Sequence, residues 1–271
     1  MTDKIEKLRN IVFVGHGGSG KTSSAEAMLF NSGATNRLGR VEDGNTILDF
    51  EPEEIKRCIS LTSSFHQFNW KKHTLCLIDT PGDQNFFSDT RAAIQAADGA
   101  VVVIDAVDGV KVQTEQAWDF VEEYHLPSVI FINKLDRERA DFTRTFTDAA
   151  NSFQPKPIIL QIPIGTESGF KGVVDLIKMK AYLYDEKGKA SMVDIPSDLK
   201  DKAEEERESL IENVVESDDD LLERYLEGES LSDDEINTAL RKGTLSRSFV
   251  PVLCGSATKN IAVDLLQDFV V

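Results

Sequence analysis

The sequence has no long apolar run, no closely spaced pair of cysteines and no excess of basic residues. Its longest apolar run, at 100–104, is far too short to cross a bilayer, and the first ten residues lack the apolar core of a signal peptide. The three cysteines are too few and too scattered for a disulfide framework. These absences argue against a membrane protein and a disulfide-rich secreted domain, so we expect a cytoplasmic protein with free thiols.

Acidic residues outnumber basic ones, 47 to 30, but they are concentrated in one segment. Residues 194–235 carry 18 Asp or Glu against four Lys or Arg, a charge of −14 out of the net −17. Nucleic acids are bound mainly through Lys and Arg, so we expect no DNA binding, although the nearly neutral remainder is free to contact a polyanion. The simple interpretation of the acidic segment is a solvated helical face, and a partner-binding surface is the alternative.

Short apolar runs alternate with amphipathic stretches through the first 160 residues. Buried strands are predicted at 11–14, 74–79, 100–106 and 128–133, and helices at 24–31, 89–97 and 113–124. Strands separated by helices favour crossover connections, and hence an α/β fold in which a mainly parallel, twisted sheet is flanked by helices. The alternating residues 64–70 predict an antiparallel strand at the sheet edge.

The pattern changes after residue 160. Residues 170–190 are typical of strands and turns, and we expect the helix that follows them to be capped by Ser197. Ser232 and Glu235 form a capping-box signature for another helix, which Gly243 is expected to end.

The spacing of the last strands indicates an insertion. A buried strand is predicted at 249–257, nearly 120 residues after Asn133. A simple crossover connection needs only about 30 residues. We therefore predict an inserted α+β subdomain at 160–245 and a main domain formed by 1–159 and 246–271.

Residues 15–22, GHGGSGKT, match G-x-x-x-x-G-K-[ST] and directly follow the first predicted strand. In such a loop, backbone N–H groups and a helix N-terminus near Lys21 converge on phosphate oxygens. Lys21 would neutralise the β- and γ-phosphates, and the Thr22 hydroxyl would bind Mg²⁺. We predict a nucleotide-binding loop formed by Gly15, His16, Gly17, Gly18, Ser19, Gly20, Lys21 and Thr22.

The motif D-T-P-G begins at Asp79, the last residue of the strand at 74–79. A carboxylate at this place is expected to hold the metal through water. Gly82 is expected to offer its N–H to the γ-phosphate, so that the loop responds to the presence of that group.

A third motif, N-K-x-D at 133–136, follows the strand at 128–133. The Asp136 carboxylate is suited to accept hydrogen bonds from the N1–H and amino groups of guanine. Adenine offers no such donor pair, which disfavours an ATP-dependent enzyme. The backbone N–H groups of Ser256 and Ala257 are expected to face guanine O6. The predicted base site comprises Asn133, Lys134, Asp136, Gly255, Ser256 and Ala257.

With these motifs in place, the whole chain resembles the GTPase domain of bacterial elongation factor G. The similarity extends to 39–60, 98–118, 131–142, 163–182, 224–236 and 251–260. It implies a P-loop GTPase fold with an inserted G′ subdomain, GTP or GDP as ligand, Mg²⁺ as cofactor and a monomeric state. It also implies docking on the ribosome, with large-subunit RNA and, through G′, the stalk protein as partners. The family continues into a β-barrel and further domains, so we expect this chain to be its nucleotide-handling module.

Four positions depart from the pattern of that family. The family usually has aspartate at Gly18 and glycine at Cys58, where those residues help to hold a monovalent cation. Ser60 matches the Mg²⁺-binding threonine of the first switch region and keeps its hydroxyl group. Asp83 replaces the histidine that orients the attacking water in D-T-P-G-H. The implied metal ligands are Thr22, Ser60 and, through water, Asp79.

Two hypotheses from different classes follow. In the first, the chain is the GTPase domain of an elongation-factor-G paralogue that supports tRNA–mRNA translocation or ribosome recycling, with Lys21 and Asp83 as catalytic residues. In the second, it is a GTP-gated ribosome-binding module with slow or absent hydrolysis, because the γ-phosphate would repel Asp83 by a few kcal/mol at ~5 Å. A ribosome-protection factor of the tetracycline-resistance type shares most motifs but fits the insert less well.

Overall fold

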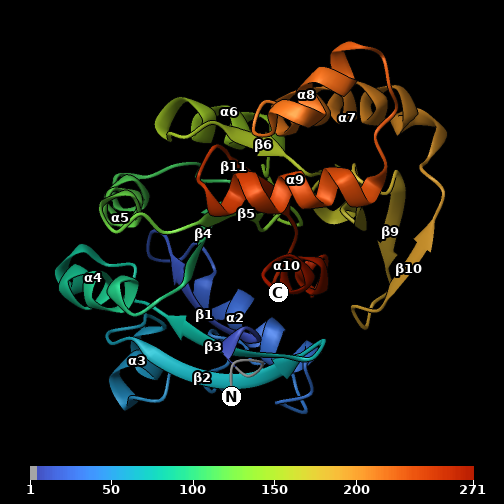
Figure 1. Ribbon diagram of the computed structural model, residues 1–271. Helices are drawn as coiled ribbons and strands as arrows, with labels where there is room; N and C mark the ends of the chain where they lie inside the picture. The colour runs from blue at the N-terminus through green and yellow to red at the C-terminus, as the bar shows by residue number, and fades with distance from the viewer. Residues whose placement is uncertain (1–4) are drawn as a thin grey trace.

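The computed structural model describes residues 5–271 and contains a seven-stranded sheet and a smaller four-stranded sheet (Figure 1). The order in the larger sheet is β2-β3-β1-β4-β5-β11-β6. Its strands are β1 (Leu8–Val14), β2 (Ser64–Trp70), β3 (His73–Asp79), β4 (Gly99–Asp105), β5 (Ser128–Asn133), β6 (Pro157–Ile159) and β11 (Val250–Cys254). All neighbours are parallel except β2, which pairs antiparallel with β3 at one edge. The predicted α/β fold and the antiparallel edge strand are confirmed.

Helices cover both faces of the larger sheet (Figure 1). One face carries α2 (Lys21–Asn31) and α10 (Val263–Phe269), and the other carries α4 (Phe87–Gln95), α5 (Val112–Glu123) and α6 (Phe142–Ser152). Successive strand residues point to opposite faces, so Phe13 packs in one apolar cluster and Val12 in the other. Strands covered on both sides are apolar throughout, which explains the continuous runs in β4 and β5. A short helix, α3 (Pro52–Arg57), lies in the connection from α2 to β2.

The smaller sheet belongs to the segment in which the insert is predicted. Its order is β10-β9-β8-β7, with every pair antiparallel. The strands are β7 (Gln161–Ile164), β8 (Gly172–Asp175), β9 (Lys180–Tyr184) and β10 (Ala190–Val193), followed by α7 (Lys200–Val215), α8 (Asp219–Leu226) and α9 (Asp233–Leu245). The chain then returns to the larger sheet as β11. This arrangement fits an α+β insert, whose boundaries at 160 and 245 stay a prediction.

Two predicted helix boundaries are wrong, and one is confirmed. Ser197 does not cap α7, because the chain enters that helix through the 3₁₀ turn Ser197–Leu199 and the helix begins only at Lys200. Gly243 does not end α9, which continues to Leu245. A Cβ on Gly243 would lie 2.3 Å from the Phe249 ring, so packing rather than chain reversal requires glycine there. The capping box of Ser232 and Glu235 is present.

Among residues 5–271, no helix combines the length and the apolar character that crossing a membrane requires.

Candidate nucleotide site

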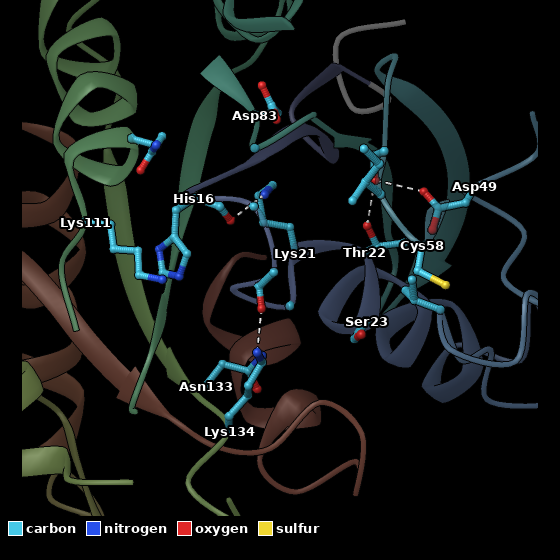
Figure 2. A pocket seen from close by; sticks show the side chains of 18 of the residues that line it. His16, Lys21, Thr22, Ser23, Asp49, Cys58, Asp83, Lys111, Asn133 and Lys134 are labelled. Atoms are coloured by element: carbon cyan, nitrogen blue, oxygen red, sulfur yellow. Dashed lines mark hydrogen bonds between the residues drawn. The ribbon is translucent and has the colours of Figure 1, made fainter. Parts of the chain in front are cut away.

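The loops that follow β1, β3, β5 and β11 meet at one cavity of about 660 Å³ (Figure 2). Its lining includes Gly17, Gly82, Lys134 and Thr258, one residue from each of these loops. The four strands run parallel, so their carboxyl ends lie at the same edge of the sheet. The sheet topology therefore brings together motifs that are more than 200 residues apart in the sequence.

The phosphate loop is held in shape by the N-K-x-D motif. Gly20 precedes α2 with a φ of 96°, and a Cβ there would lie 2.2 Å from Asn133 Nδ2. Only glycine combines this left-handed backbone with such a close approach. Asn133 Nδ2 donates to the Ser19 carbonyl at 3.0 Å, and Lys134 Nζ donates to the Gly18 carbonyl. The two motifs thus form one structural unit, and α2 begins at Lys21 as predicted.

A buried lysine and a buried carboxylate lie under the loop. Lys21 is 6 % exposed, and its Nζ donates to the carbonyls of Gly15 and His16, each at 3.0 Å. Burial lowers the pKa of Lys21, and the charge of Asp79 opposes that shift. Burial likewise raises the pKa of Asp79, against the charge of Lys21. Asp79 Oδ1 is buried and accepts no hydrogen bond from the described residues. The site therefore contains an acceptor oxygen that lacks a cation or donor.

Two hydroxyl groups complete a set of oxygen ligands. Thr22 Oγ1 lies 3.2 Å from Ser60 Oγ, and Ser60 donates its proton to Asp49 Oδ1 at 2.8 Å (Figure 2). Because that proton goes to Asp49, Ser60 accepts the proton of Thr22, and both hydroxyl oxygens keep a lone pair for a metal ion. Together with the unpartnered oxygen of Asp79, this set fits Mg²⁺, which prefers oxygen ligands. Sequence reasoning missed Asp49, since a single aspartate in an acidic loop carries no signal that its side chain is buried.

The loop after β3 lies directly on the phosphate loop. The Gly82 carbonyl accepts a hydrogen bond from the Gly17 N–H at 3.0 Å, and a Cβ on Gly82 would lie 2.4 Å from that nitrogen. The residue predicted to offer an N–H to the γ-phosphate thus presents its carbonyl to the phosphate loop here. Asp83 is exposed, and its Oδ1 accepts hydrogen bonds from Asn85. Figure 2 shows Asp83 and Lys134 on opposite sides of Lys21.

The predicted base site is only partly open to a ligand. Asp136 Oδ1 is buried without a partner among residues 5–271, as a carboxylate awaiting donors would be. The two predicted N–H donors are engaged, however, because Ser256 donates to the Ile261 carbonyl at 3.0 Å and Ala257 to Asn133 Oδ1 at 2.9 Å. Thr258, the next residue, lines the cavity. Gly255 lies against Phe131, so close that a Cβ there would be 2.8 Å from its ring.

His16 is buried beside a pair of carboxylates. Its Nδ1 lies 2.9 Å from Thr114 Oγ1, and its Nε2 is 3.9 Å from Asp108 Oδ2. Burial, together with the charges of Lys21 and Lys111, lowers the pKa of His16 to about 4.

This cluster has the donor atoms of a metal site, because one oxygen each of Asp105 and Asp108 lies within 4.8 Å of a His16 ring nitrogen. Both carboxylates already pair with lysines, Asp108 with Lys111 at 2.6 Å and Asp105 with Lys134 at 2.7 Å. We therefore interpret the cluster as an ion-pair network that supports the phosphate loop.

The family described as "Elongation factor Tu GTP binding domain" matches residues 6–271, almost the whole chain. The protein belongs to this family. It is the G domain of a translational GTPase of the elongation factor G or Tu type. A crystal structure of a protein from Thermus thermophilus superposes with a TM-score of 0.91 at 31 % identity over 97 % of this chain. The chain spans 40 % of the length of that protein.

Proposed function

We propose that this G domain binds GTP with Mg²⁺ and that the full-length protein hydrolyses GTP on the ribosome, in the cytoplasm, as an elongation-factor-G-like factor. Translocation of tRNA and mRNA and ribosome recycling are the two roles that this activity would support. The observation that carries the proposal is the buried pair of Lys21 and Asp79, with an unpartnered carboxylate oxygen, under a glycine-rich loop. Asp136 adds guanine selectivity, because its buried oxygen needs the donors that guanine provides.

Each motif has a distinct part in binding. The N–H groups of 15–22 that have no protein acceptor would surround the phosphates, and Lys21 would neutralise their charge from below. The Gly17 N–H would join them only after leaving the Gly82 carbonyl, to which it is bonded at 3.0 Å. Mg²⁺, when bound, stabilises negative charge on the β- and γ-phosphates, and Thr22, Ser60 and, through water, Asp79 are the residues that would hold it. Lys134 supports the phosphate loop, because its ammonium group donates to the Gly18 carbonyl and to Asp105.

In hydrolysis, a water oxygen forms a bond to the γ-phosphorus while the bond to the bridging oxygen breaks, giving GDP and phosphate. The proton of the water ends on the phosphate product. Catalysis of this step depends mainly on positioning and charge stabilisation, which Lys21 supplies and to which Asp83 contributes by accepting a hydrogen bond from the water.

The second candidate, a GTP-gated ribosome-binding module with slow or absent turnover, also rests on a specific observation. Asp83 lines the same cavity as Lys21, and this candidate function requires its carboxylate to come close to the γ-phosphate. Two negative groups at ~5 Å repel by a few kcal/mol at an effective dielectric near 20. Such repulsion would keep the loop away from the geometry needed for hydrolysis while leaving nucleotide binding intact.

GTP turnover by the full-length protein, with and without ribosomes, separates the two candidates. The proteins compared are wild type, Asp83→His and Asp83→Asn. Asparagine removes the charge of Asp83 but can still cap the turn at 84–86. Asp83→Asn therefore shows whether a change in Asp83→His comes from loss of the charge or from loss of the cap. Strong ribosome-stimulated turnover by wild type would eliminate the binding module. Turnover by the histidine variant alone would eliminate the enzyme.

The ribosomal partners are large-subunit RNA and the stalk protein. The acidic segment 194–235 forms α7, α8 and the start of α9 and has most of its acidic side chains exposed, as a surface that meets a basic partner would. We propose that this surface contacts the stalk protein and that the nearly neutral main domain contacts the RNA. We expect that reversing several of these charges abolishes binding to purified stalk protein. Unchanged binding would show that the acidic segment is not the stalk-binding surface.

A further inference from the structure

The Asp83 carboxylate is held by one residue, Asn85. Asp83 Oδ1 accepts two hydrogen bonds, from the Asn85 backbone N–H at 2.9 Å and from Asn85 Nδ2 at 2.8 Å. No donor among residues 5–271 is bonded to Oδ2. Both residues line the cavity that contains Lys21 and Thr22.

This arrangement makes the two oxygens of the carboxylate unequal. Two donors on Oδ1 fix the rotation of the carboxylate and withdraw charge from that oxygen, since a hydrogen bond to a charged acceptor is a strong one. Oδ2 receives neither of these bonds and keeps its lone pairs, and Asp83 is among the residues that line the cavity. The position of the loop is fixed as well, because the Gly82 carbonyl is bonded to the Gly17 N–H at 3.0 Å.

We propose that Asn85 is a positioning residue for GTP hydrolysis: it holds Asp83 so that Oδ2 accepts a hydrogen bond from the attacking water. The inference rests on the proposed GTPase function. The covalent step is unchanged, with a bond formed from the water oxygen to the γ-phosphorus, the bond to the bridging oxygen broken, and the proton transferred to the phosphate product. Asp83 orients the water, and the proton of the water does not have to stay on Asp83. The amide of Asn85 also lessens the repulsion between Asp83 and the γ-phosphate, which a carboxylate at 85 would increase.

The bond from the Asn85 backbone N–H also caps the turn Gln84–Phe86, so a purely structural role must be separated from positioning. The chain offers a matched test, the exchange Asp83→Asn with Asn85→Asp. Asparagine and aspartate cap turns about equally well, so the exchange keeps an amide–carboxylate pair and the cap but moves the carboxylate by two residues. Asn85→Ala removes only the side-chain donor, and Asn85→Ser restores one hydroxyl donor.

The experiment measures kcat and KM for GTP with the full-length protein on ribosomes, together with the affinity for fluorescent GDP and thermal unfolding. For Asn85→Ala we expect kcat to fall roughly tenfold with KM and GDP affinity unchanged, and for Asn85→Ser an intermediate kcat. The exchange variant should bind GDP and unfold like wild type but lose at least as much kcat as Asn85→Ala.

Wild-type kcat in Asn85→Ala or in the exchange variant would overturn the positioning role and leave the GTPase function standing. A fall in GDP affinity or in unfolding temperature that accounts for the lost kcat would overturn it too, in favour of the structural cap. Absence of ribosome-stimulated turnover in wild type would overturn the GTPase function itself, and that result is visible without any variant.

Discussion

Lowering the pH should destabilise this domain through His16. The imidazole is 2 % exposed, and burial first, then the charges of Lys21 and Lys111, lowers its pKa from 6.5 to about 4, against the opposite effect of Asp105 and Asp108. A base with a depressed pKa binds fewer protons in the folded than in the unfolded state. The unfolding free energy is therefore unaffected by His16 above pH 6.5, falls as the pH drops below that value, and stops falling near pH 4.

A shift of about 2.5 pKa units at about 1.4 kcal/mol per unit gives a loss of about 3 kcal/mol between pH 7.5 and pH 4. The contribution of His16 can be isolated by urea unfolding of the nucleotide-free domain at half-unit pH steps, with wild type compared with His16→Gln. Other titrating groups, including Asp79, contribute to both proteins and cancel in the difference. Thr114→Val is the matched control, because it removes the partner of Nδ1 at 2.9 Å but leaves the ring buried. Parallel curves for wild type and His16→Gln would refute a buried, neutral His16.

Three further substitutions test local features of the fold and the site. Cys58→Gly should raise the unfolding free energy by about 1 kcal/mol, since Cys58 ends α3 with a φ of 54°; Cys58→Ala, which keeps a Cβ, should give no such gain in urea unfolding. Gly243→Ala should lower the unfolding free energy by about 1–3 kcal/mol, because the added Cβ overlaps with Phe249. Gly169→Ala, where a Cβ would meet no atom within 4 Å, should leave the unfolding free energy nearly unchanged. A more stable Gly243→Ala variant would contradict the packing argument. Asp136→Asn should weaken GDP binding by about 100-fold and favour xanthosine nucleotides in a competition titration, and unchanged base selectivity would remove Asp136 from the base site.

The sequence was sufficient for those parts of the fold that depend on local pattern. Apolar runs predicted β1, β3, β4, β5 and β11, whereas the short strands β6 and β7 were not predicted. The order of strands and helices predicted a parallel sheet because crossover connections allow little else. The start of α2 at Lys21 followed from the glycines before it. The failures at Ser197 and Gly243 have one cause in common. In both, the residue type suggested a local structure that the surrounding chain overrides. A 3₁₀ turn precedes α7 at Ser197, and α9 continues past Gly243, where the glycine packs against the Phe249 ring.

Among the predicted site residues, Lys21 and Asn133 line the cavity, whereas Asp136, Ser256 and Ala257 are not part of its lining. The sequence also did not predict which atoms the lining residues present. Asp49 was missed because its burial depends on how the loop before α3 folds back over α2. The Gly82 carbonyl, rather than its N–H, faces Gly17, and the Ala257 N–H is bonded to Asn133. A motif constrains residue types, whereas the orientation of a peptide group depends on every hydrogen bond formed around it.

The charge balance of the cavity links these details to nucleotide binding. Two buried carboxylates, Asp49 and Asp79, are close to a single buried lysine, Lys21. Burial raises the pKa of both carboxylates, and for Asp49 this occurs even though Ser60 donates to it. Without a further cation, a polyphosphate bound next to this buried group would add negative charge where two carboxylates already face one lysine. The oxygen ligands at Thr22 and Ser60 are placed where a divalent cation would correct that deficit, so nucleotide and Mg²⁺ are expected to bind as one unit. Asp83 adds a further negative charge at the rim of this cavity, and for that reason the hydrogen bonds it receives from Asn85 bear directly on hydrolysis.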